Sequence, residues 1–109
     1  RGHSSSTMTR RLGPAAAYVA LIQQARDAFR SGDRVRAEHL AREALAHDPE
    51  RAAAYNVLAA VREMHGRHDA AVDLLRAGLA VEPTYEPAKQ NLDRLVSHPN
   101  RVGIQLGDD

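Results

Sequence analysis

Apolar and small residues recur at helical spacing in two neighbouring segments in the middle of the chain. Tyr55, Leu58 and Ala59 share one face of the first segment. A similar stripe follows in the second segment and consists of Ala71, Leu74, Leu75, Gly78 and Leu79. Such spacing is typical of amphipathic helices. Gly66 lies between the segments, where a chain reversal favours a residue that tolerates positive φ, and Pro83 stops the second helix. The pattern therefore predicts a helical hairpin.

The same pattern appears 34 residues earlier in the chain. Superposing residues 18–51 on residues 52–85 gives nine identities, and six of them fall on positions that a helical hairpin uses for packing or reversal. These six pairs are Ala25 and Ala59, Gly32 and Gly66, Ala37 and Ala71, Leu40 and Leu74, Leu45 and Leu79, and Pro49 and Pro83. The chain therefore contains an internal repeat of two helical hairpins.

A period of 34 residues carried by paired helices resembles the tetratricopeptide repeat family, from about Ala15 to Val96. The resemblance implies an all-α fold, in which antiparallel helical hairpins stack in a right-handed superhelix. It also implies a non-catalytic module for protein–protein interaction. The chain departs from the family at Ala28 and Arg62, where a large apolar residue is usual. Phe29, one residue further on, is a substitute in the first repeat.

The repeats divide the chain into three parts. Residues 1–13 are expected to be a disordered N-terminal segment, of which residues 1–7 (RGHSSST) resemble an expression-tag remnant. Residues 14–97 form the predicted repeat domain, and residues 98–109 form a C-terminal tail. The domain is expected to hold repeats over residues 18–51 and 52–85, helices over about residues 14–31, 34–47, 50–65 and 68–81, and a capping helix over residues 85–97.

The capping helix is expected to follow Thr84, a candidate N-cap, and to accept Pro87 in its first turn. Its apolar face consists of Ala88, Leu92, Leu95 and Val96. A polar face is expected to point outward and consists of Lys89, Gln90, Asn91, Asp93 and Arg94. In a repeat stack, a lone helix of this kind covers the exposed apolar end.

Composition narrows the classes of function. A chain of 109 residues forms one domain, too small for a large enzyme cavity. The absence of Cys fits a reducing compartment, so we expect a cytoplasmic protein, and the preference for Arg over Lys is bacterial-like. A net charge of +1 without a basic stripe argues against nucleic acid as a partner. The apolar run from Ala15 to Ile22 follows two arginines, but it is too short for a membrane span and lacks the cleavage site of a secretory signal.

The histidines suggest a metal site, but their spacing argues against one. His39, Glu43 and His47 follow one another at intervals of four residues along one helix. The outer two are about 12 Å apart by helical rise, so one ion cannot bind all three. No nucleophile lies near a base in the predicted fold, and the glycines form no phosphate-binding loop. We therefore expect no metal, no cofactor and no enzymatic activity.

A repeat stack exposes the first helix of each hairpin along a concave groove. The residues expected to line this peptide groove are Val19, Ile22, Arg26, Phe29, Arg30, Ala53, Asn56, Ala60, Glu63, Met64, Gln90 and Arg94. Several of them are apolar, so the alternative is that these complete the core instead of binding a ligand. Ile22 stands where a clamp for acidic C-termini would need a cation, so that specificity is not expected.

The sequence predicts a module that binds a protein or peptide segment in this groove, with Phe29, Arg26 and Arg94 as the best-placed anchors. The alternative is a regulatory or scaffold subunit that assembles with itself, as a homodimer, through groove and tail. The tail from Val102 to Asp109 combines apolar side chains with carboxylates. It therefore suits the groove, either in cis or from a neighbouring copy.

Overall fold

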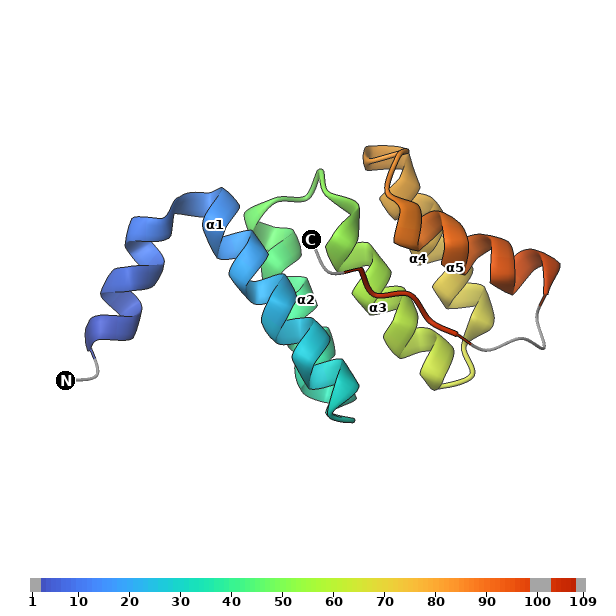
Figure 1. Cartoon of the computed structure of the whole chain (residues 1–109), viewed down its shortest axis with the longest axis horizontal. Coiled ribbons are helices and arrows are strands. Elements are labelled where there is room, and N and C mark those ends of the chain that lie inside the picture. The colour runs from blue at the N-terminus through green and yellow to red at the C-terminus, as the bar shows by residue number, and fades with distance from the viewer. Residues whose placement is uncertain (1–2, 99–102, 108–109) are drawn as a thin grey trace.

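The computed structural model describes residues 3–98 and 103–107 of the chain. Within these residues the protein consists of helices and irregular segments, without strands. The helices are α1 (His3–Arg30), α2 (Arg34–His47), α3 (Ala52–Met64), α4 (His68–Val81) and α5 (Glu86–Ser97). Figure 1 shows α1 with α2 and α3 with α4 as antiparallel hairpins, with α5 beside the second hairpin. The predicted all-α helical-repeat fold is confirmed.

The first helix bends at Gly13, which has a φ of 75° and a ψ of 172°. Pro14 follows it, and a proline disfavours helical geometry in the residue before it. Pro14 also opens the second part of α1, as predicted. The helix begins at His3, whereas residues 1–13 were expected to be disordered. No Gly or Pro lies between His3 and Gly13 to interrupt a helix. This first part points away from the hairpins (Figure 1).

The hairpins pack through small residues. Ala25 of α1 and Ala37 of α2 are both fully buried, as is Ala71 of α4. Gly78 of α4 lies so close to α3 that a Cβ on it would be 2.9 Å from the Cβ of Tyr55. The helices can therefore approach closely only because these side chains are small or absent.

The larger residues of the predicted stripes are divided between buried positions and the edge of the core. Leu58 is buried in the cluster between the hairpins, and Leu75 is buried in the cluster that includes residues of α5. Leu79, which belongs to the same predicted apolar stripe as Leu75, is only partly covered and lies at the edge of the core. Leu45, the equivalent residue of the first repeat, is partly covered in the same way.

The N-terminus of α3 is capped by residues from other parts of the chain. The hydroxyl of Tyr18 in α1 accepts a hydrogen bond from the backbone N–H of Ala54 at 2.9 Å. Glu82, just after α4, accepts another from the N–H of Ala52 at 2.8 Å. Burial raises the pKa of Tyr18 to about 12, so its hydroxyl stays protonated and also donates to the carbonyl of Arg51. These bonds satisfy N–H groups that a helix leaves open at its start.

Ala28 and Arg62, which stand where the family usually has a large apolar residue, are accommodated in different ways. Ala28 is buried, and Phe29 packs partly buried against the same cluster. Arg62 of α3 instead reaches Glu38 of α2 and donates two hydrogen bonds to its carboxylate, at 2.9 and 3.0 Å. Glu38 also accepts from Arg42, one turn further along α2. A bidentate ion pair therefore stands where an apolar contact would join the hairpins.

The capping helix differs in detail from its predicted faces. Thr84 is not the N-cap, because Tyr85 holds that position and its side chain makes no capping bond. Val96, assigned to the apolar face, is 57% exposed. Asn91 and Arg94, assigned to the outward face, are both buried. The helix is therefore rotated so that its polar residues Asn91 and Arg94 face α3 rather than solvent.

Candidate functional site

The C-terminal tail, here the described residues 103–107, lies across α3, the first helix of the second hairpin, and is bonded to residues of α1 and α5 as well. Figure 1 shows it crossing α3, between α1 and α5. The tail receives hydrogen bonds from Arg26 in α1, Asn56 in α3 and Asn91 in α5. We call the surface formed by these three residues and Tyr85 the inner face. The tail and the inner face together form the candidate site.

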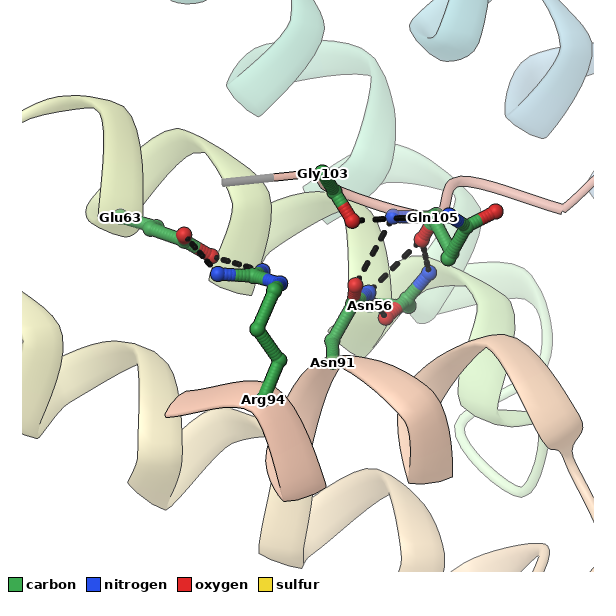
Figure 2. A network of polar contacts seen from close by, with 6 residues as sticks. All are labelled: Asn56, Glu63, Asn91, Arg94, Gly103 and Gln105. Atoms are coloured by element: carbon green, nitrogen blue, oxygen red, sulfur yellow. Dashed lines mark hydrogen bonds and ion pairs between the residues drawn. The ribbon is translucent and has the colours of Figure 1, made fainter. Parts of the chain in front are cut away.

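Two asparagines hold the main chain of Gln105. Asn91 Oδ1 accepts from the N–H of Gln105 at 2.8 Å, and Asn91 Nδ2 donates to the carbonyl of Gln105 at 2.7 Å. Asn56 Nδ2 donates to the same carbonyl at 2.8 Å. Figure 2 shows these bonds converging on the backbone of Gln105, while the residue as a whole is exposed. The two asparagines therefore bind the main-chain N–H and C=O of Gln105, which are groups that any peptide offers.

The asparagines also position each other. Asn91 Nδ2 donates to Asn56 Oδ1 at 2.8 Å, so the two amides are linked across the gap between α3 and α5 (Figure 2). Asn56 is fully buried and Asn91 is 3% exposed. Buried amides need partners for most of their donors and acceptors. The tail backbone supplies those partners at both residues.

Arg26 provides the third contact. Its Nε donates to the carbonyl of Leu106 at 3.0 Å, and one of its terminal nitrogens donates to the Tyr85 hydroxyl at 3.0 Å. Arg26 is 2% exposed, although it carries a charge. Buried guanidinium groups persist in proteins when hydrogen bonds satisfy them. The tail carbonyl is one of the groups that make this burial possible.

Glu63 and Arg94 form a buried ion pair between α3 and α5. Arg94 donates to the two carboxylate oxygens at 2.5 and 2.7 Å (Figure 2). Their side chains are 12% and 8% exposed. Both residues were predicted to line the groove, and Arg94 was expected to anchor a ligand. The charge of Arg94 is instead compensated within the protein, so it ties the two helices together.

The other predicted groove residues are divided between core and surface. Ile22, Ala53 and Ala60 are buried in the protein interior, and Val19 and Phe29 are partly buried. Met64 is 46% exposed, and Gln90 is also exposed. Arg30 lines a cavity of about 410 Å³ beside the tail and forms an ion pair with Asp27 at 3.7 Å. Of the predicted set, only Arg26 and Asn56 donate a hydrogen bond to the described tail residues.

Two residues of the inner face were missed by the sequence analysis. Asn91 was placed on the outward face, yet it lies three residues after Ala88 and four before Leu95, on the same helical stripe as these buried residues. That spacing was a readable signal. Tyr85 was expected to start a helix, and no local pattern pointed to its contact with Arg26 across 59 positions of sequence.

The described residues show no group of three His, Asp or Glu side chains that could hold a metal ion. His39 and Glu43 approach to 3.9 Å, but both lie on the solvent-exposed side of α2, with exposures of 78% and 52%. Among the same residues, no helix combines the length and the apolar character that a membrane crossing requires.

Comparison with known proteins identifies the fold family. The family model described as tetratricopeptide repeat matches residues 28–94, more than half of the chain. The chain belongs to the tetratricopeptide repeat family. No curated protein and no solved structure matches it. Tetratricopeptide repeats generally mediate protein–protein interactions and are typically non-catalytic. The matched residues include Asn56 and Asn91, the two amides that hold the tail.

Proposed function

We propose that this tetratricopeptide repeat protein binds an extended peptide segment of a partner protein on its inner face. The observation that carries this proposal is the position of the chain's own tail. Within the described residues of the tail, the hydrogen bonds from Asn56, Asn91 and Arg26 go to main-chain groups of Gln105 and Leu106. A segment from another protein offers the same N–H and C=O groups. It can therefore take the place of the tail.

The residues of the inner face are also bonded to one another. Asn56 is joined to Asn91 and Arg26 is joined to Tyr85, so these bonds support the donors in addition to the bonds with the tail. Fixed donors lower the entropy that binding must overcome. The tail, being attached to the same chain, is present at a high effective concentration and competes with any external segment. A partner must therefore displace it.

Peptide binding to a full-length variant with a displaced tail tests the proposal. Leu106 is only 8% exposed and lines the cavity that Arg30 also lines. Leu106→Lys places a second cation there, so the tail should leave while the helices remain. A fluorescent peptide with the sequence of residues 102–109 should then raise fluorescence polarisation on binding. The wild-type chain should bind the peptide more weakly, because its own tail competes.

Asn91 supplies the decisive control. Adding Asn91→Ala to the Leu106→Lys chain should abolish peptide binding, because two hydrogen bonds to the peptide of about 0.5–1.5 kcal/mol each are lost, together with the bond that positions Asn56. Asp93→Ala, on the exposed side of the same helix, is the matched control and should bind like its parent. Circular dichroism checks that each variant is folded. Equal binding by the Asn91 and Asp93 variants would contradict the proposal, and so would no binding to the parent.

The alternative proposal is self-assembly through the same contacts, with the tail of one copy on the inner face of another. It is supported by the same main-chain bonds, since a neighbour's tail offers identical groups. Sedimentation velocity separates the two proposals. A wild-type dimer that becomes monomeric with Leu106→Lys would support self-assembly. A monomer in both cases would support a tail held in cis and an external partner.

A further inference from the structure

The tail changes from exposed to tightly surrounded within three residues. Gln105 is exposed, Leu106 is 8% exposed, and Gly107 lies against Tyr85, Arg26 and Pro87. The inner face therefore treats consecutive positions of a bound segment differently. We propose that it selects segments in which a large apolar residue is followed directly by glycine. This inference rests on the proposed peptide-binding function.

Glycine is required at position 107 for two independent reasons. Its φ is +80°, a backbone conformation that L-residues with a side chain rarely adopt. A Cβ at this position would also lie 2.6 Å from the Tyr85 hydroxyl, 3.1 Å from a terminal nitrogen of Arg26 and 3.2 Å from Pro87 Cγ. The first of these distances is too short for a Cβ, because a carbon atom cannot form the hydrogen bond that would allow an oxygen to approach so closely.

The groups around Gly107 are held in place. Tyr85 is 6% exposed and Arg26 is 2% exposed, and the two are joined by a hydrogen bond of 3.0 Å. Pro87 is fixed by its ring and by its place in the first turn of α5. Movement of Arg26, or of Tyr85 bonded to it, would disturb the contact that positions Leu106, because Arg26 also holds the carbonyl of Leu106. The three residues around Gly107 therefore exclude a side chain at this position instead of moving to accommodate it.

The neighbouring positions lack this combination. Leu106 is buried, so its position favours an apolar side chain through area removed from water. Gln105 is held only by its main chain, and its side chain makes one long bond to the carbonyl of Gly103 at 3.5 Å. Gly103 also has a positive φ, but no atom lies within 4 Å of a Cβ built on it. Selection by contact with the inner face should therefore concentrate at positions 106 and 107, whereas Gly103 is constrained by its backbone conformation alone.

Peptide variants on the full-length Leu106→Lys chain test this selectivity. The reference is the peptide of residues 102–109, measured by fluorescence polarisation. The peptide carrying Gly107→Ala should bind at least roughly tenfold more weakly, since the backbone strain alone corresponds to about that factor. The peptide carrying Leu106→Ala should also bind several-fold more weakly. The peptide carrying Gln105→Ala is the matched control and should stay within about twofold of the reference.

A variant of the protein tests whether Tyr85 is the residue that excludes a side chain at position 107. Tyr85→Phe removes the hydroxyl that an alanine Cβ would meet at 2.6 Å. The difference in affinity between the reference peptide and the Gly107→Ala peptide should therefore become smaller. A general loss of protein stability would weaken both peptides and leave this difference unchanged. Equal binding of the reference and Gly107→Ala peptides would overturn this inference and leave the peptide-binding function standing. If the reference peptide itself fails to bind, the proposed function fails and the inference with it.

The tail itself gives a second readout that needs no external peptide. In the otherwise wild-type chain, Gly107→Ala should release the tail, and the N–H of Gln105 should lose its protection against hydrogen exchange. Gln105→Ala should retain protection at the same position, because the bond to Asn91 comes from the main chain. Unchanged protection in the Gly107→Ala chain would overturn the inference.

Discussion

Acidification should destabilise the protein by protonating Glu38, the carboxylate that joins α2 to α3. Two hydrogen bonds from Arg62, supported by one from Arg42, hold the pKa of Glu38 at about 2, against an ordinary value of 4.5. A carboxyl group with a lower pKa in the folded state favours folding at higher pH. The contribution of Glu38 is therefore fully present above about pH 4.5 and is lost as the pH falls towards 2.

The magnitude follows from the pKa and the exposure of the pair. The fall from 4.5 to about 2 corresponds to about 3 kcal/mol, because one pKa unit is worth about 1.4 kcal/mol. The side chains of Glu38 and Arg62 are 25% and 24% exposed, so water screens part of this attraction. We therefore expect about 1–2 kcal/mol of unfolding free energy from the pair.

Urea unfolding of the wild type and Glu38→Gln, from neutral pH down to about pH 3, measures this contribution. At neutral pH the unfolding free energy of Glu38→Gln should be about 1–2 kcal/mol lower than that of the wild type. Below about pH 4.5 this difference in unfolding free energy should become smaller. Glu43→Gln, on an exposed carboxylate of the same helix, is the matched control. Parallel stability curves for the wild type and Glu38→Gln would refute the reasoning, and so would an equal loss in Glu43→Gln.

Two further predictions concern the core and the cap of α3. Leu58→Ala should cost about 2–5 kcal/mol, and Leu79→Ala only about 1–2 kcal/mol, because Leu58 is buried and Leu79 is partly covered. Equal costs in urea melts would contradict this difference in burial. Tyr18→Phe should cost about 1–3 kcal/mol, because the buried N–H of Ala54 loses its acceptor. A thermal melt measures the loss, and faster hydrogen exchange at Ala54 locates it. An unchanged exchange rate there would show that the hydroxyl does not cap α3.

The candidate site was only partly predictable from the sequence. Arg26 and Asn56 were placed on the groove side by the helical pattern, and both contact the tail. Asn91 was missed because it lies 35 residues after Asn56, one residue out of step with the repeat period. Arg94 was placed on the groove side, but its pairing with Glu63 depends on how α5 is rotated against α3. A one-residue offset on a helix turns a side chain by about 100°, which is enough to exchange inside for outside.

The sequence by itself determined the helical hairpins and their order. Helix starts, chain reversals and apolar stripes depend on residues within a few positions of one another, so the 34-residue period and the glycine at each turn were sufficient evidence. The bounds of α2 and α4 agree with those predicted for the same reason.

Only the tertiary structure decided which distant polar groups meet. Tyr18 caps α3 from 36 positions away, and Arg62 reaches Glu38 across 24. The tail lies where three helices present their donors together, and Arg26 reaches Leu106 across 80 positions. Such contacts depend on the angles and rotations at which helices pack. Packing sets these angles through many small contacts at once, and no local run of residues encodes them.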